Sequence, residues 1–333
     1  MKVLAIETSC DETSVAVVKD GRKILSNKIL SQIQTHQVFG GVVPEIASRE
    51  HLESINYVIK AGLEDAKLDF KDIDLVAVTN GPGLVGALLV GVSSAKAISM
   101  AINKPLIGVN HMEGHVCANY LAHEDLKPPF ISLVVSGGHS YLIDVTDYTE
   151  YEVIGRTRDD AAGESYDKVA RALGLGYPGG PAIQKAAEKG DKHAIDFPRV
   201  MLEKDSYDFS FSGLKTAVLN YLNQEKMAGR QININDVAAS FQEAVNDVLV
   251  SKSIRLLKET NRKHFVLSGG VAANLPLREK FEKELQKIDV KMYYPPLALC
   301  TDNAAMIGSA GYYNFKARGA DDLSLDVDPN LGL

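Results

Sequence analysis

Cysteine is scarce in this sequence, and tryptophan is absent. The 333 residues include three cysteines, Cys10, Cys117 and Cys300, which lie far apart along the chain. Because no two of them form a CxxC pair, the sequence indicates neither a disulfide framework nor a zinc site built from thiolates. Scattered free thiols are typical of a protein that works in a reducing cytoplasm.

Positive charge is also in deficit. Lysine and arginine number 36 against 43 aspartates and glutamates, which gives a formal net charge of −7. This balance excludes a protein covered in positive charge for nucleic acid. A local basic face is still allowed, since affinity for phosphates follows the local cluster of charges. The pattern GxxxxGK[ST] is missing, so the chain is not a P-loop enzyme.

A secretion signal and a clear membrane span are missing as well. The first residues, MKVLAIETSCDE, enter an apolar strand at once and reach an acid at Glu7, unlike a signal peptide. The most apolar window, residues 83–102, contains Lys96 and has a helical period. We therefore interpret it as a buried helix and expect no membrane association.

Strands and helices alternate along the chain, as in an α/β protein, and 333 residues suit two domains. Residues 4–18 and 132–145 each read as a strand, a small polar turn and a second strand. Residues 75–89 and 265–277 each read as a strand, a glycine-rich turn and a helix. This weak repeat predicts a duplicated fold with a cleft between its halves. The alternative is that two unrelated α/β domains share the same local patterns.

Four glycine turns follow strand-like runs or precede helices. The first, GPGLVG at 81–86, matches the dinucleotide fingerprint, but the next strand ends in Asn110 and His111 and offers no acid for a ribose. We expect instead a tight turn before a packed helix, or a helix N-terminus that faces an anion. SGGHS at 136–140 and SGGVAAN at 268–274, together with PGG at 178–180, favour a nucleotide held from several sides.

The segment HMEGH places His111 and His115 four residues apart. On a helix this spacing puts both side chains on one face, where they can bind one metal. Glu113 lies midway and points elsewhere, so the segment does not match the HExxH motif of zinc proteases. The alternative is a pair of structural histidines on a helix surface.

A third ligand is available in CTDNAAM, residues 300–306, where Asp302 stands near the start of the last expected helix. Two histidines and one carboxylate form the facial set that suits non-haem iron and leaves positions open for a substrate. The alternative for Asp302 is an ordinary helix N-cap.

Ten sequence blocks together closely resemble the bacterial tRNA N6-adenosine threonylcarbamoyltransferase (TsaD-type) family. Members were once described as O-sialoglycoprotein endopeptidases, and archaeal and eukaryotic relatives form the KEOPS catalytic subunit. The blocks run in order over nearly the whole chain: IETSCDET, GGVVPEIASR, GPGLVGALLVG, HMEGH, VSGGHS, DDAAGESYDK, YPGGP, DFSFSGLKT, SGGVAAN and CTDNAAM. The chain departs from the family pattern at three points. Ser140 stands where threonine is usual, Ser268 stands where alanine is frequent, and Leu275-Pro276 follow Asn274 in place of a more polar pair.

The resemblance implies an α/β fold of the actin-like ATPase class (ASKHA, a duplicated ribonuclease-H-like fold). Two related lobes would enclose a central nucleotide and metal cleft. The first lobe is expected to comprise residues 1–108 with 302–333, and the second residues 109–301.

The resemblance also implies an acyltransferase that acts in tRNA modification. Such enzymes transfer threonylcarbamoyl from threonylcarbamoyl-adenylate to N6 of adenosine 37, next to the anticodon, in tRNAs that read codons beginning with A, and release AMP. An adenine amine is a poor nucleophile, whereas an acyl-adenylate is already activated. The enzyme must therefore mainly align the two and polarise the carbonyl.

Site residues carry over by position. One divalent metal, most often Fe2+ with Zn2+ or Mn2+ as alternatives, would be held by His111, His115 and Asp302. Substrate and nucleotide contacts would fall on Ser136, Gly137, Gly138, His139, Ser140, Asp167, Gly180 and Asn274. Glu12 or Asp11, in a turn that faces the expected cleft, would assist proton removal from N6, unless both are merely solvated surface acids.

The expected partners are tRNA, ATP or the adenylate, a paralogous subunit of the same fold (TsaB-type) and a small P-loop ATPase (TsaE-type), all in the cytoplasm. Basic residues that could meet tRNA gather in the expected second lobe: Arg156, Arg158, Lys168, Arg171, Lys185, Lys189 and Lys192. Two other functions compete. A small-molecule kinase of this fold would have no use for a His-His-Asp site, and a non-catalytic ATP-binding scaffold would be expected to lose one of the three ligands.

Overall fold

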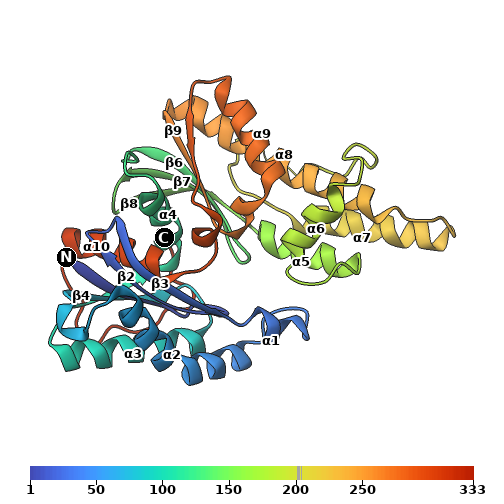
Figure 1. Cartoon of the computed structure of the whole chain (residues 1–333). Coiled ribbons are helices and arrows are strands. Elements are labelled where there is room, and N and C mark those ends of the chain that lie inside the picture. The colour runs from blue at the N-terminus through green and yellow to red at the C-terminus, as the bar shows by residue number, and fades with distance from the viewer. Residues whose placement is uncertain (201–202, 204) are drawn as a thin grey trace. The chain divides into compact units, whose positions relative to one another are not determined.

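The computed structural model describes every residue except 201, 202 and 204, and the chain divides into two compact units (Figure 1). Unit 1 comprises Met1–Pro128, Asp147–Tyr151 and Tyr294–Leu333, and unit 2 comprises Pro129–Thr146 and Glu152–Tyr293. The lobe boundaries expected from the sequence, after residues 108 and 301, differ from this grouping. Residues 109–128 and 294–301 belong to unit 1, because the helix that carries the two histidines packs on the last helix of the chain.

Unit 1 is built on a five-stranded sheet in the order β3-β2-β1-β4-β5. Its strands are β1 (Lys2–Glu7), β2 (Glu12–Lys19), β3 (Lys23–Ser31), β4 (Leu75–Gly81) and β5 (Leu106–Asn110). The β1–β2 and β2–β3 pairs are antiparallel, whereas β4 is parallel to β1 and β5 is parallel to β4. Aliphatic and β-branched residues fill the central strands, as expected for strands buried on both faces.

Helices cover both faces of this sheet. The helices of unit 1 are α1 (Ile33–Gln37), α2 (Pro44–Ala66), α3 (Val85–Ile102), α4 (His111–Ala122) and α10 (Ala304–Arg318), with the short turns η1 (Phe70–Asp72) and η3 (Leu297–Leu299), and α2, α3 and α10 pack on the sheet. Leu4 and Ile6 of β1 pack with the apolar faces of α2 and α3 in one core cluster. Strand side chains alternate, so Ala5 faces the other way, toward α10. There Gly311 approaches the sheet so closely that an added methyl would lie 2.6 Å from Cβ of Ala77.

The most apolar helix, α3, is long and apolar enough to cross a membrane by length and composition alone. Val92 and Ala95 on one face are buried in the core of unit 1. Val85, Leu89 and Met100 are exposed, so α3 is a core helix along one face only and is less enclosed than the sequence predicts.

Unit 2 repeats the topology of unit 1. Its sheet has the order β10-β9-β6-β7-β8, and its strands are β6 (Phe130–Val135), β7 (Ser140–Asp147), β8 (Glu150–Arg156), β9 (His264–Ser268) and β10 (Lys291–Tyr293). β6 is antiparallel to β7 and parallel to β9, which is parallel to β10. Matching β6 to β1 and β9 to β4 reproduces the first sheet, so the internal repeat predicted from the sequence is confirmed.

The helices of unit 2 carry the remaining glycine turns. They are α5 (Ala162–Ala172), α6 (Gly179–Ala187), α7 (Ser212–Met227), α8 (Ile234–Thr260) and α9 (Leu275–Gln286), with the 3-10 turn η2 (Gly270–Ala273). The long α8 packs against α6, α9 and β6, and it buries Val237, Phe241, Val245 and Val248, as its periodicity predicts.

Candidate metal centre and glycine turns

The two histidines lie on the first turns of α4, directly after β5. Asn110 caps this helix, because its side-chain oxygen accepts a 2.8 Å hydrogen bond from the amide of Met112. The helical spacing brings the rings of His111 and His115 edge to face, with centroids 4.7 Å apart. The sequence prediction of a shared helical face is therefore confirmed.

Asp302 meets both histidines from the segment before α10. Its Oδ1 lies 3.3 Å from Nε2 of His111 and 3.3 Å from Nε2 of His115. One ligand atom from each residue falls within 4.8 Å of the others. The helix itself is capped by Asn303, whose side chain accepts from the amide of Met306. The alternative interpretation of Asp302 as the N-cap is therefore wrong.

These donors fit a metal ion on physical grounds. His115 is fully buried, and within the described part of the chain Nδ1 has no hydrogen-bond partner, while Nε2 has the 3.3 Å contact with Oδ1 of Asp302 but no well-aligned hydrogen bond. An unsatisfied buried polar group costs about 1–3 kcal/mol, so a cation bound at Nε2 would relieve a real penalty. Burial would lower the pKa of His111, yet Asp302 and Glu7 raise that pKa well above its ordinary value. The surroundings thus favour positive charge at this point.

Sequence reasoning missed Glu7. This fully buried residue ends β1, and its Oε2 lies 3.1 Å from Nδ1 of His111. Its carboxylate also accepts from the amide of Ser9 and from the hydroxyl of Thr79. The signal that could have found it is an acid at the end of an otherwise apolar strand, where burial is costly without donors.

Asp11 is the last residue of the turn between β1 and β2, and Glu12 is the first residue of β2, close to the same site. Burial, followed by the charges of Asp302 and Asp11, raises the pKa of Glu12 to about 10. A carboxyl group with that pKa keeps its proton at neutral pH unless a nearby positive charge lowers it. His51 of α2 anchors the turn, with Nε2 2.9 Å from the carbonyl oxygen of Cys10.

The glycines of GPGLVG are explained by packing. A methyl group added at Gly83 would lie 2.6 Å from the carbonyl oxygen of Ser9, and one at Gly86 would lie 2.5 Å from Oγ of Ser48. At Gly81 it would collide with the carbonyl oxygen of Asp328. This turn is therefore the tight turn before a packed helix, as the sequence favours, and protein atoms occupy the space beside its glycines.

The glycine turns of unit 2 differ in this respect. A methyl group added at Gly137, Gly138, Gly180 or Gly270 would meet no atom within 4 Å. These four glycines border open space, which a ligand could use. Three separate turns of unit 2, between β6 and β7, at the start of α6 and in η2, thus leave their backbones accessible.

Two polar side chains hold these turns in place. Asp167 accepts a 2.7 Å hydrogen bond from the amide of Gly179, at the start of α6. Asn274 caps α9 by accepting from Leu277, and its amide donates to Oε1 of Gln242 at 2.7 Å. Asn274 is expected from the sequence to contact the substrate or nucleotide, but its side chain is already hydrogen-bonded within unit 2. Gln242 itself was not found from the sequence.

The fold resembles solved structures of low sequence identity. The phosphate- and nucleotide-bound form of full-length HypF has a TM-score of 0.63 at 15% identity, over 96% of this chain and 56% of that one. Component A of the Acidaminococcus fermentans (R)-2-hydroxyglutaryl-CoA dehydratase has a TM-score of 0.54 at 17% identity, over 95% of this chain and 98% of that one. With the duplicated sheet topology, this confirms the actin-like α/β fold class.

Closer relatives identify the family. A family model described as tRNA N6-adenosine threonylcarbamoyltransferase (TsaD) matches residues 23–309. A protein of that name from Clostridioides difficile (strain 630) is 58% identical over 98% of this chain and 97% of its own length. Another, from Clostridium beijerinckii, is 55% identical over 99% of this chain and 98% of its own. The chain therefore belongs to the tRNA N6-adenosine threonylcarbamoyltransferase family.

Proposed function

We propose that this protein transfers the threonylcarbamoyl group of threonylcarbamoyl-adenylate to N6 of adenosine 37 in tRNAs that read codons beginning with A. The observation that carries the proposal is family membership at 58% identity over 98% of the chain. The His111, His115 and Asp302 cluster supports it, because this chain retains all three donors side by side. The kinase and scaffold alternatives are not favoured.

The reaction balances as an acyl transfer. The N6 amine attacks the carbamoyl carbon, the bond from that carbon to the phosphate oxygen breaks, and AMP leaves with the bonding electrons while N6 loses a proton. One divalent metal, held by His111, His115 and Asp302, would supply Lewis acidity toward the carbonyl oxygen. A set of two imidazoles and one carboxylate favours Fe2+, with Zn2+ and Mn2+ as alternatives.

The glycine turns of unit 2 are the proposed adenylate site. The backbone of Ser136, Gly137, Gly138, His139 and Ser140 would approach the nucleotide. Gly180, in the turn that Asp167 holds, and the separate turn that Asn274 holds would also face it. Open space beside Gly137, Gly138 and Gly180 supports this assignment. Backbone N–H groups that line such space can bind phosphate oxygens without a charged side chain.

Glu12, with Asp11 beside it, is the proposed acceptor of the N6 proton. Burial and the neighbouring carboxylates raise the pKa of Glu12, which favours binding of a proton at its carboxyl group. Positive charge at the histidine site would favour that ionised form.

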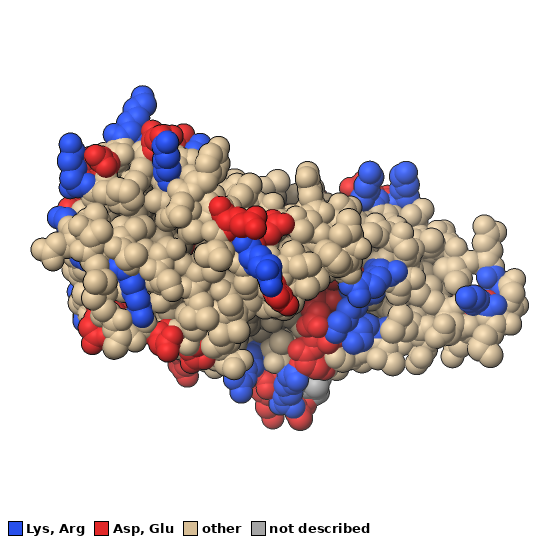
Figure 2. All heavy atoms as spheres, turned by 90° about the horizontal axis from the view of Figure 1, so that it is seen from below, with Lys and Arg blue, Asp and Glu red and all other residues tan. Residues whose placement is uncertain are grey.

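Contact with tRNA requires basic side chains that are not already neutralised. Arg158 pairs with Glu203 and Asp208, Lys168 with Asp160 and Glu164, and Lys192 with Glu243. On the face shown in Figure 2, basic side chains likewise lie next to acidic ones. Among the described residues, Arg156, Lys185 and Lys189 form no ion pair and are the better candidates. We also propose that the protein works in the cytoplasm, together with a paralogous subunit of the same fold and a small P-loop ATPase.

Mass spectrometry of tRNA nucleosides tests the function. The purified protein would be added to a cell extract that lacks its own transferase, and threonylcarbamoyl-adenosine would be quantified. We expect the modified nucleoside to appear only with the protein and with tRNA present. Modification that is unchanged by the His111→Ala variant would contradict the assignment of the metal site, and its absence with the wild type would contradict the function.

A further inference from the structure

The buried carboxylate of Glu7 contacts His111 at the ring nitrogen that does not face Asp302. In β1, Leu4 and Ile6 face α2 and α3, so Glu7 has its side chain on the opposite face. Glu7 is fully buried, a position where an ionised group is unfavourable unless donors surround it. Its presence there therefore calls for a specific set of partners.

Donors surround this carboxylate. The amide of Ser9 donates to Oε1 at 2.5 Å, and the hydroxyl of Thr79 donates to Oε2 at 2.5 Å. These two contacts fix both oxygens and leave Oε2 facing Nδ1 of His111 at 3.1 Å. Because an ionised carboxylate only accepts hydrogen bonds, Nδ1 of His111 must be the donor. The hydroxyl of Ser9, 3.2 Å from the same nitrogen, can share that proton as a second acceptor.

A proton on Nδ1 determines the other side of the ring. An imidazole that binds a metal is neutral and has one ring proton, so a proton on Nδ1 leaves the lone pair of Nε2 for the metal. Nε2 of His111 is the atom that lies 3.3 Å from Oδ1 of Asp302. We infer that Glu7 is a positioning residue, which holds His111 in the tautomer and orientation that bind metal through Nε2.

This inference deepens the proposed function and rests on its metal site. Outer carboxylates of this kind raise the basicity of a ligating histidine, and their loss typically lowers metal affinity about 10–100-fold. The effect should be confined to one ligand. Within the described residues Nδ1 of His115 has no hydrogen-bond partner, so no comparable group fixes the second histidine.

The test is the Zn2+ affinity of the full-length Glu7→Gln variant, measured by competition with a chromophoric chelator. Glutamine keeps the shape of the side chain, but its amide can donate to Nδ1 and thereby move the ring proton to Nε2. We expect the dissociation constant for Zn2+ to rise about 10–100-fold. In the His111→Ala background, Glu7→Gln should add little further loss, because the two residues act as one unit.

The matched control is Glu113→Gln on the same helix. Glu113 is also a largely buried carboxylate, but it accepts from Nδ2 of Asn314 at 2.6 Å and does not contact the histidines. The Zn2+ affinity of the Glu113→Gln variant should stay within about twofold of wild type, a change much smaller than the loss expected for Glu7→Gln. Equal losses in both variants would show general loosening of the core and would overturn the inference.

A measurement without any variant decides the matter if Glu7→Gln does not fold. In the Zn2+-loaded wild type with 15N-labelled histidine, NMR should show His111 protonated at Nδ1 and bound through Nε2. Zn2+ on Nδ1, or wild-type affinity in folded Glu7→Gln, would overturn the inference. If His111→Ala and His115→Ala also keep Zn2+, then the proposed metal site itself fails, which is a separate outcome.

Discussion

The rings of His111 and His115 meet edge to face, with an interplanar angle of 81° and Nε2 of each ring 3.3 Å from the same oxygen of Asp302. Ordinary packing does not require two imidazoles to point at one carboxylate oxygen. The geometry follows from a four-residue helical spacing on α4 and from a chain segment that returns to it just before α10.

Removal of one ligand should remove the metal. We expect His111→Ala, His115→Ala and Asp302→Asn each to lower metal content in the purified protein to less than about a tenth of wild type. The fold should remain, because the apolar core cluster of unit 1 does not include these side chains. Metal analysis and circular dichroism measure the two quantities. Metal content that is unchanged in His111→Ala would refute the three-residue site.

The open glycine turns predict a binding defect without a folding defect. Gly137→Val and Gly270→Val place side chains in free space, and neither glycine has a positive φ that would forbid valine. We expect AMP and ATP to bind at least about tenfold more weakly, while the free energy of unfolding changes by less than about 0.5 kcal/mol. Calorimetric titration and urea unfolding give the two values.

Gly269 is the control for this prediction. It has a φ of +86° and packs against the carbonyl oxygen of Val135. Gly269→Ala should therefore destabilise the protein by about 1–3 kcal/mol. If Gly137→Val and Gly270→Val keep wild-type nucleotide affinity, these turns are structural only.

Binding to tRNA should depend on the unpaired basic residues. We expect the triple glutamine variant of Arg156, Lys185 and Lys189 to weaken tRNA binding and to reduce the slope of log affinity against log salt. The reduction should be roughly 0.7–0.9 for each phosphate that the variant no longer neutralises. Arg158→Gln is the control, because Asp208 and Glu203 already neutralise that side chain. Filter binding over a range of salt concentrations measures the slope. An unaltered slope in the triple variant would place the tRNA face elsewhere.

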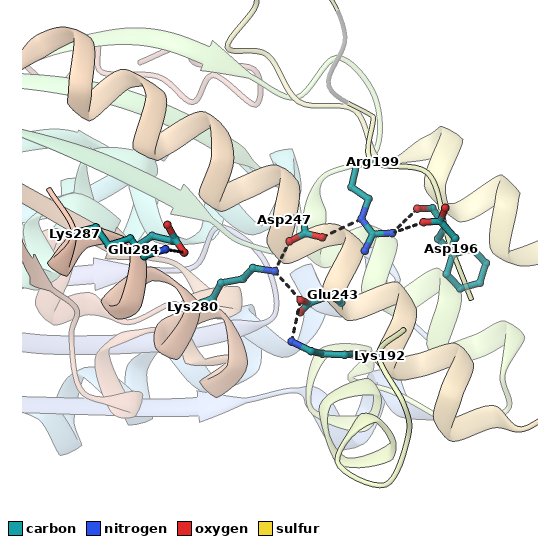
Figure 3. A network of polar contacts seen from close by, with 9 residues as sticks. Lys192, Asp196, Arg199, Glu243, Asp247, Lys280, Glu284 and Lys287 are labelled. Carbon is teal, nitrogen blue, oxygen red and sulfur yellow. Dashed lines mark hydrogen bonds and ion pairs between the residues drawn. The ribbon is translucent and has the colours of Figure 1, made fainter. Parts of the chain in front are cut away.

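An ion network in unit 2 predicts the response to acid (Figure 3). Glu243 and Asp247 both lie on α8. Lys280 of α9 contacts Glu243 at 2.8 Å and also contacts Asp247, and Arg199 contacts Asp247 at 2.9 Å. Burial raises the pKa of each carboxyl, but hydrogen bonds from the basic side chains outweigh burial and hold both pKa values below normal. Groups with a depressed folded pKa stabilise the protein above their unfolded pKa, at about 4, and this stability is lost as the pH falls through the folded pKa.

Lys280→Met should therefore make acid unfolding begin at a higher pH and lower the free energy of unfolding at neutral pH by about 1 kcal/mol, since the network is partly exposed. Urea unfolding as a function of pH provides the measurement. Lys287→Met is the control, because Lys287 and its partner Glu284 are both solvent-accessible and such pairs contribute little. Identical acid profiles for Lys280→Met and wild type would argue against the network.

Local patterns in the sequence determined much of this protein. Apolar residues recur at helical spacing over residues 49–66 and 235–259, a pattern that predicts two helices, and α2 and α8 cover these ranges. The HMEGH spacing was sufficient to place two imidazoles on one helical face, because a helix fixes neighbours at i and i+4 by its geometry alone. The repeat of strand and turn patterns predicted a duplicated fold for the same reason: each pattern specifies a local element.

Only the tertiary structure decided which distant groups meet. The sequence left open whether Asp302 caps the last helix, and the structure excludes that role because Asn303 caps α10. It also gave no reason to single out Glu7, because the value of a buried carboxylate depends on donors at Ser9, Thr79 and His111 that the sheet and α4 bring together. Nor could it show that Gly83 faces protein atoms while Gly137 faces open space. Glu7 meets Thr79 and His111, and Gly83 meets Ser9, from distant parts of the chain, so these contacts are set by the packing of helices on a sheet and not by local preference.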